Sequence, residues 1–131
     1  QTALDNAGVD PGRIDHVNAH AASTPSGDAA EAAAITRVLG DRAASVPVTS
    51  VKGAIGHCMG AAGAIETVAA VLTIAEGQIP PTLNYRIPDP KIDLDIVHGG
   101  ARAATVNVMT KHSFGLGGQN ACLVLGRYAS G

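Results

Sequence analysis

The alternation of apolar and polar residues predicts short buried strands separated by helices. Residues 46–51 are mostly β-branched and are followed by Gly53, which is typical of a short buried strand. Residues 59–76 carry almost no charge, so we expect a helix that is buried on most of its surface. The same patterns predict helices at 1–7 and 28–39 and strands at 14–21, 94–97, 104–113 and 121–128. This order predicts an α/β fold with a mixed sheet layered with helices.

Turn and cap residues refine this prediction. Asp28 and Glu31 have the spacing of a capping box, so we expect the helix 28–39 to begin there and to end at Gly40. Residues 78–90 contain four prolines, which predicts an extended connector without regular structure. One face of the predicted strand 14–21 carries three polar residues, His16, Asn18 and His20.

The composition limits the class of protein. A chain of 131 residues is long enough for one domain with a hydrophobic core. The apolar share is 46% but only three residues are aromatic, so the core must consist of aliphatic side chains, as in a buried sheet. A net charge of −2 leaves no basic surface for nucleic acid. The longest apolar run is too short to cross a bilayer, so we expect no membrane partner.

The two cysteines, Cys58 and Cys122, follow no metal-binding or disulfide pattern. We therefore predict a reduced, cytoplasmic setting with no metal and no cofactor. The chain has no initiator methionine and begins within a predicted helix, so we expect it to be part of a larger protein.

The stretch 50–66 is the strongest candidate for chemistry. His57 lies where the predicted strand gives way to the helix, and the positive end of a helix dipole favours a neutral imidazole. A neutral imidazole can donate an N–H to an oxygen that becomes negative. The alternative is a core histidine that is satisfied by backbone groups. Lys52 and Glu66 favour the first interpretation, because charges in apolar sequence are costly unless they are paired or used.

Other candidate residues support simpler interpretations. The glycine-rich stretch 115–118 predicts a tight turn that presents backbone N–H groups beside an exposed Phe114. A phosphate site would need a helix after this stretch, whereas we predict a strand there. Cys58 is interpreted as a small buried side chain rather than a nucleophile. Three histidines without supporting neighbours are interpreted as solvated or capped side chains: His16, His98 and His112.

Three segments together resemble a known family. Residues 17–28, 52–66 and 113–120 are similar to the motifs NAHGTSTPxGD, KxxxGHxxGAAGxxE and NSFGFGGxN of the β-ketoacyl-acyl carrier protein synthases. The motifs are specific, occur in the family's order and extend over nearly the whole chain. Residues 81–85 and 88–95 further resemble the type II, elongating enzymes of actinobacteria.

This resemblance implies a thiolase-like layered fold built from two similar halves, with residues 1–131 as the C-terminal half and the cysteine-bearing N-terminal half absent. It implies a 3-oxoacyl-[acyl-carrier-protein] synthase, an acyltransferase of fatty acid elongation that joins malonyl-carrier protein to an acyl thioester with loss of CO₂. The implied partners are acyl carrier protein, the N-terminal half and a second copy in a homodimer. The chain alone is expected to be inactive and to expose an apolar face toward the missing half.

The resemblance also assigns roles to residues. His20 and His57 would hold the malonyl thioester oxygen and stabilise the enolate, and Lys52 and Glu66 would form the supporting charge pair. The implied substrate-binding residues are Phe114, a gate to the acyl pocket whose loop N–H assists an oxyanion hole, Thr24 on the pantetheine arm, and Gly115 and Gly117. Asn18 and Glu66 are further candidates for a structural monovalent cation, as in some relatives.

Two alternative functions remain compatible with the motifs. One is a ketosynthase domain of a polyketide synthase, which shares them. The other is a non-catalytic partner such as a chain-length factor, although a silent site would not need His20, Lys52 and His57. The sequence departs from the family's pattern at Ala22, at Lys111-His112 and at Leu116, which concerns substrate preference more than the reaction.

Overall fold

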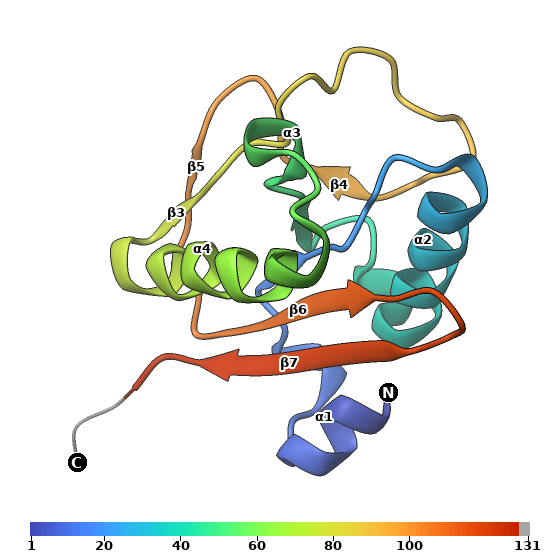
Figure 1. Ribbon diagram of the computed structural model, residues 1–131. Coiled ribbons are helices and arrows are strands. Elements are labelled where there is room, and N and C mark those ends of the chain that lie inside the picture. Colours follow the sequence, from blue (N-terminus) through green and yellow to red (C-terminus); the bar gives the residue numbers. More distant parts are fainter. Residues whose placement is uncertain (129–131) are drawn as a thin grey trace.

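The computed structural model describes residues 1–128, and the last three residues of the predicted domain lie outside it (Figure 1). The α-helices are α1 (Thr2–Ala7), α2 (Pro25–Leu39), α3 (Lys52–Ile55) and α4 (Ala62–Glu76), with 3-10 turns η1 (Pro11–Arg13), η2 (Gly40–Arg42) and η3 (Met59–Ala61). The strands are β1 (His16–Asn18), β2 (Pro47–Thr49), β3 (Gln78–Ile79), β4 (Asp95–Ile96), β5 (Arg102–Ala103), β6 (Val108–Phe114) and β7 (Asn120–Gly126). The predicted α/β class with a mixed sheet is confirmed.

The main sheet has the order β4-β2-β1-β6-β7, in which only β7 runs antiparallel to its neighbour. Its two faces carry separate cores. Val17, Val48 and Val108 pack with residues of α1 and α2 on one face, whereas Met109 packs with α4 on the other. Because successive side chains of a strand alternate, His16, Asn18 and Lys111 lie on the α4 face. The prediction that His16 and Asn18 share one face is therefore confirmed.

The strand predicted at 14–21 is shorter, because the backbone turns after Asn18. Ala21 and Ser23 have positive φ angles of 35° and 67°, which a strand does not allow. The capping prediction for α2 was wrong as well. The helix begins at Pro25, and the Thr24 hydroxyl accepts the Gly27 N–H at 3.2 Å.

Asp28 and Glu31 therefore do not form the predicted capping box. Asp28 Oδ1 accepts the N–H groups of Ser23 and Thr24 at 3.1 and 3.3 Å, so it closes the turn that precedes α2. Glu31 is buried and faces the sheet. Its role in the candidate site follows below.

The predicted passage from strand to helix near His57 is interrupted. A short helix, α3, follows β2, and Gly56 then adopts a φ of 75° before η3 and α4. The connector packs closely against α3, since a Cβ at Gly53 would lie 2.3 Å from the carbonyl oxygen of Leu83. Only glycine fits at that contact. His57 consequently lies in an exposed linker between two helices.

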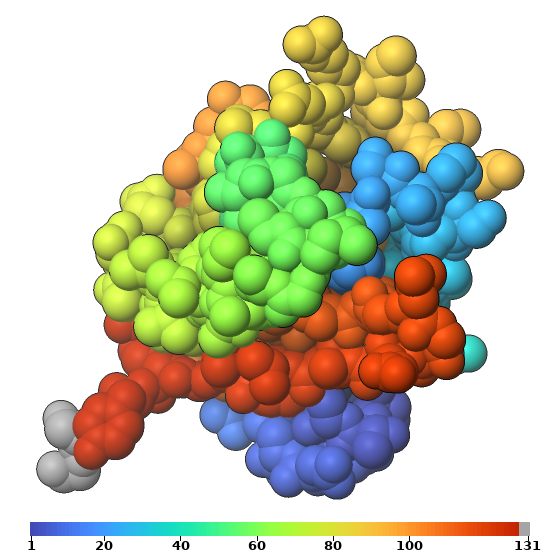
Figure 2. Space-filling view, in the orientation of Figure 1, coloured from blue at the N-terminus to red at the C-terminus, as the bar shows by residue number. Residues whose placement is uncertain are grey.

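Helix α4 is not buried on most of its surface, contrary to the prediction. Its buried residues form one face: Ala62, Glu66, Ala70, Thr73 and Ile74. The opposite face exposes apolar side chains, namely Ile65, Val68, Val71 and Leu72. Figure 2 shows α4 open on the surface, uncovered by other segments. An exposed apolar face was expected, and it is present here.

By length and apolar composition, Met59–Glu76 would also suffice to cross a membrane. That is weak evidence, because the core helix of a folded protein meets the same criteria. The charged residue Glu66, which is buried against Lys52 of α3 and Lys111 of β6, favours a core helix.

The later strands differ from the prediction mainly at their ends. Gln78–Ile79 pairs antiparallel with Arg102–Ala103, so the first two residues of the predicted connector form strand β3. The residues between β3 and β4 form no helix or strand, as predicted, but they are not extended throughout: turns lie at 83–84 and 90–91, and Asn84 has a φ of 65°. Strand β6 begins at Val108 rather than at Ala104, and β7 ends at Gly126 rather than at Tyr128.

Candidate active site

Three rings from distant segments meet at one end of the parallel strands. His20 follows β1, His57 lies between α3 and η3, and Phe114 ends β6. The ring centroids of His20 and His57 are 5.4 Å apart in an edge-to-face arrangement, and those of His20 and Phe114 are 5.5 Å apart. All three rings line a cavity of about 380 Å³ together with residues of η3 and of the β6–β7 turn.

The tautomer of His57 is fixed by the main chain. The backbone N–H of Met59 donates to His57 Nδ1 at 3.1 Å. An amide N–H only donates, so Nδ1 must present its lone pair and the proton of the neutral ring resides on Nε2. His57 therefore offers an Nε2–H donor at the cavity. Sequence reasoning attributed the neutral ring to a helix dipole, whereas the structure provides a hydrogen bond.

His20 is held by its backbone on two sides. Its N–H donates to Glu31 Oε1 at 2.9 Å, and its carbonyl oxygen accepts from Lys52 Nζ at 2.5 Å. Burial and the nearby Lys52 ammonium lower the pKa of the His20 imidazole, while Glu31 opposes the shift. His20 is therefore neutral near pH 7.

A buried charge cluster lies behind His20. Lys52 Nζ pairs with Glu66 Oε1, and Lys111 Nζ lies 2.8 Å from Glu66 Oε2. The side chains of Lys52, Glu66 and Lys111 are 6%, 1% and 1% exposed. The expected pairing of Lys52 with Glu66 is present. The sequence analysis did not include Lys111 in this cluster. The signal was its position two residues after Met109 on β6, which places both side chains on the α4 face.

His112 was also misinterpreted, since it is neither solvated nor capped. Its Nδ1 lies 2.8 Å from Glu31 Oε1. Burial disfavours the charged ring, but Cys122 and Glu31 outweigh burial and raise the pKa of His112 to about 9. Burial likewise opposes ionisation of Glu31, yet hydrogen bonds from His112 and from the backbone of Ala21 and His20 lower the pKa of that carboxyl. The pair is therefore ionic at pH 7.

This ion pair connects two segments of the candidate site. Glu31 holds the backbone of His20 and Ala21, and the His112 ring stacks on Phe114 with centroids 5.8 Å apart. His112 therefore positions Phe114 relative to the loop that carries His20. Sequence reasoning missed this link because His112 and Glu31 are far apart along the chain.

We expect the stability of the protein to depend on this pair in alkaline solution. The pKa of His112 is raised and that of Glu31 is lowered in the fold, so the pair stabilises fully between the ordinary glutamate pKa of 4.5 and about pH 6.5; it is lost as the pH rises through about 9, and in acid once Glu31 is protonated. His112→Gln should cost about 1.5–3 kcal/mol near about pH 6 and much less at about pH 10. Thermal unfolding at these two pH values measures this, with the exposed His98→Gln as control. Equal losses for His112→Gln at both pH values would contradict the assignment.

The remaining predicted residues have mixed outcomes. His16 is fully buried rather than solvated, lacks a hydrogen-bond partner in the described chain, and burial lowers its pKa to about 4. His98 is exposed beside the Tyr85 ring. Phe114 is half-buried rather than exposed, because its ring packs on His20 and His112.

The glycine-rich turn contributes to the site unevenly. Gly115 lines the small cavity, but its N–H donates to the Gln119 carbonyl at 2.7 Å and is not free for an oxyanion. Gly117 does not line that cavity; it has a φ of 82°, which shapes the turn. The Gly115 N–H is therefore engaged within the turn, and the substrate-binding roles of Gly115 and Gly117 stay predictions.

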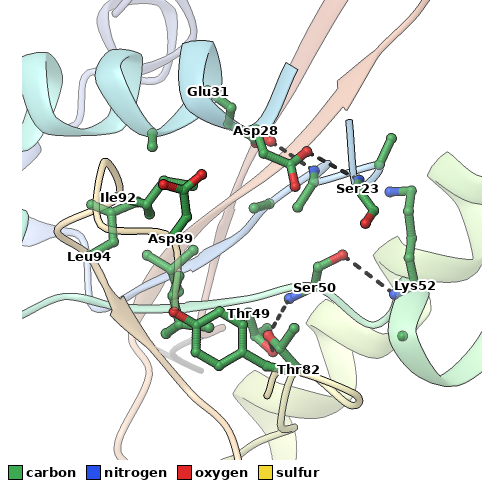
Figure 3. Close-up of a pocket in the computed structure, with 18 of the residues that line it drawn as sticks. Ser23, Asp28, Glu31, Thr49, Ser50, Lys52, Thr82, Asp89, Ile92 and Leu94 are labelled. Carbon is green, nitrogen blue, oxygen red and sulfur yellow. Dashed lines mark hydrogen bonds between the residues drawn. The ribbon is translucent and has the colours of Figure 1, made fainter. Parts of the chain in front are cut away.

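A second cavity of about 730 Å³ opens between α2, α3 and the proline-rich connector. In the close-up of Figure 3, Ser23 and Asp28 lie on one wall, with Ser50 and Thr82 opposite. Thr24 also lines this cavity, while its hydroxyl caps α2. His57 lines both cavities and thus lies at their junction. An extended arm in the larger cavity would reach the His57 ring.

Residues 1–86 match the sequence profile of the β-ketoacyl synthase C-terminal domain. The chain belongs to the β-ketoacyl synthase family. It is 44% identical over 96% of its length to 3-oxoacyl-[acyl-carrier-protein] synthase 2 of Synechocystis, and 48% identical over 94% to a putative β-ketoacyl synthase of oxytetracycline polyketide formation in Streptomyces rimosus. It spans 30% and 29% of the length of these two curated relatives.

Solved β-ketoacyl synthases share the fold of the chain. The ishigamide ketosynthase/chain length factor aligns over 98% of this chain and 31% of its own with a TM-score of 0.93 and 43% identity. A type II polyketide ketosynthase, solved with its acyl carrier protein and bound to a hexaketide, aligns over 98% of this chain and 31% of its own with a TM-score of 0.95 and 35% identity. The predicted thiolase-like fold is confirmed.

Proposed function

We propose that the protein to which this chain belongs is a 3-oxoacyl-[acyl-carrier-protein] synthase. The single observation that carries the proposal is the convergence of His20 and His57 on one cavity, with their ring centroids 5.4 Å apart. Two neutral imidazoles side by side form a pair of N–H donors for one oxygen. A decarboxylating condensing enzyme needs this arrangement where negative charge develops.

The proposed reaction begins with a malonyl thioester whose carbonyl oxygen lies between the two rings. When the bond to the carboxylate breaks, CO₂ leaves and the electron pair enters an enolate, whose negative oxygen accepts N–H groups from His57 Nε2 and His20. The enolate carbon then attacks the carbonyl of an acyl thioester held on a cysteine. A carbon–carbon bond forms and the cysteine thiolate leaves, so a 3-oxoacyl thioester is the product.

Supporting residues maintain this geometry. Lys52 fixes the main chain of His20 through its carbonyl oxygen, and Glu66 fixes Lys52. Phe114 is proposed as the gate between the histidines and an acyl pocket, because its ring packs 5.5 Å from His20. Thr24 is proposed to contact the pantetheine arm in the larger cavity, on whose wall it lies.

The nucleophile is proposed to lie outside this chain. Neither Cys58 nor Cys122 belongs to the family's nucleophile motif, and the chain spans less than a third of its relatives. We propose that residues 1–131 form a C-terminal half whose N-terminal counterpart supplies the cysteine and covers the apolar face of α4. The chain alone is then inactive, and the complete protein binds acyl carrier protein and assembles as a homodimer.

A polyketide ketosynthase is the second candidate, and the oxytetracycline and ishigamide relatives favour it specifically. The two candidates differ in product rather than in chemistry. An elongating fatty acid enzyme adds one unit to a saturated acyl chain, whereas a polyketide enzyme extends a chain that retains its ketones. A non-catalytic chain-length factor would release no CO₂ at all.

The full-length protein should convert acyl- and malonyl-carrier protein into 3-oxoacyl-carrier protein with one CO₂ released per product. Mass spectrometry of the carrier protein and CO₂ release measure the two products. His20→Ala should lower the rate by a factor of about 10²–10³, since one of the two N–H donors to the oxyanion is lost. Asp41→Ala, an exposed residue of η2 that lines neither cavity, should leave the rate unchanged. Absence of both products from every acyl donor would refute the proposed function.

A further inference from the structure

The buried charges around Glu66 determine whether a structural monovalent cation can bind there. The family resemblance implies a monovalent cation at Asn18 and Glu66, so the structure must be tested for a place where such an ion fits. One observation favours the ion. The Asn18 side chain is fully buried, and neither its oxygen nor its nitrogen has a hydrogen-bond partner in the described chain. An amide oxygen of this kind is a suitable ligand for Na⁺ or K⁺.

Lys111 occupies the Glu66 side of the position that such an ion would take, and its ammonium makes no hydrogen bond to the Asn18 amide. The parallel register of β1 and β6 places Asn18 directly beside Lys111, with both residues on the α4 face. Lys111 Nζ lies 2.8 Å from Glu66 Oε2 and donates to Ser113 Oγ. The ammonium thus contacts a carboxylate and a hydroxyl oxygen, which are the ligand types that a monovalent ion would use.

Charge balance excludes an additional ion as well. Glu66 already faces two ammonium groups, Lys52 on Oε1 and Lys111 on Oε2. All three side chains are nearly free of solvent, so a metal ion would add a third positive charge to a single buried carboxylate. Na⁺ or K⁺ therefore does not fit this site while Lys111 is present.

Helix α4 approaches closely at this point. A Cβ at Gly63 would lie 3.4 Å from Ser113 Oγ and 3.8 Å from Lys111 Nζ. The absence of a side chain at Gly63 therefore lets the helix seal the lysine from solvent. The Lys111 side chain is 1% exposed, and its ammonium contacts Glu66 and Ser113.

We propose that Lys111 is a built-in replacement for a structural monovalent cation. Its ammonium secures one oxygen of Glu66, which leaves the other for Lys52, and Lys52 in turn holds the carbonyl oxygen of His20. The folded protein consequently needs no Na⁺ or K⁺ at this place. This inference concerns folding and stands independently of the proposed function.

Thermal unfolding of the full-length protein in different salts tests the proposal. The midpoint of the wild-type protein should be the same in about 0.1 M KCl, NaCl or tetramethylammonium chloride, where the ionic strength is equal and only the last cation is too large to enter. Lys111→Ser opens space lined by oxygens at Glu66. Its midpoint should be low in tetramethylammonium chloride and should rise with KCl or NaCl along a saturating curve.

Two further variants serve as controls. Lys111→Met removes the positive charge but fills the space, so K⁺ should not raise the unfolding midpoint of this variant. Lys91→Ser removes an exposed lysine and should behave as the wild type in every salt. A saturable response of the wild-type midpoint to K⁺ or Na⁺ would overturn the proposal. So would the absence of rescue in Lys111→Ser, including its failure to fold in KCl and in NaCl.

Discussion

His57→Ala in the full-length protein should abolish most decarboxylation of malonyl-carrier protein, with a loss of about 10²–10³-fold in rate. The variant removes the Nε2–H donor that the hydrogen bond from Met59 to Nδ1 prepares. That donor faces the cavity shared with His20, where the enolate oxygen would lie. The measurement is CO₂ release from malonyl-carrier protein, followed separately from condensation.

Two comparisons make the result specific. Transfer of the acyl chain to the protein's own cysteine should persist in His57→Ala, because the proposed role of His57 begins after that step. His57→Asn keeps a side-chain N–H and should retain more decarboxylation than His57→Ala. Substantial decarboxylation by His57→Ala would discredit the assigned role.

Glu66→Gln should destabilise the protein by about 3–5 kcal/mol, the cost of leaving buried charges without their partner. The substitution preserves the shape of the side chain but leaves Lys52 and Lys111 facing a neutral amide. Denaturant unfolding with equal slopes for both proteins measures the difference. The effect is large because one carboxylate balances two ammonium groups.

Glu76→Gln is the matched control, since Glu76 ends the same helix and is exposed to solvent. Its effect should fall within about 0.5 kcal/mol. A loss for Glu66→Gln as small as that of the control would mean that the two lysines do not depend on Glu66. In that case neither the charge cluster nor its support of His20 would stand.

The sequence predicted the long elements better than their ends. Helix 59–76 and the last two strands were located because their patterns are long and regular. The strand at 14–21 was predicted too long, because Ala21 and Ser23 have positive φ angles and residue types other than glycine do not indicate such angles in a sequence. The burial of α4 was overestimated, since apolar composition does not distinguish a face covered by the chain itself from one left for another segment.

The site was predictable in part from local chemistry. The pairing of Lys52 with Glu66 was predicted from charges in apolar sequence and the neutral His57 from a helix dipole, whereas the approach of His20 to His57 came from the family resemblance. The burial and contacts of Lys111 and His112 were not predicted, because the exposure of a strand residue depends on what covers its side of the sheet. Long-range pairs such as Glu31 with His112 leave no local pattern.

Helix α4 carries polar residues on its buried face and large apolar residues on its exposed face. Its polar residues Glu66 and Thr73 face the protein's own sheet, while Val68 and Leu72 point outward. Ordinary surface helices do the opposite. If the proposed N-terminal half covers the outward side, part of the free energy that stabilises this domain would come from that contact, and folding of the domain would then be coupled to docking of its cover.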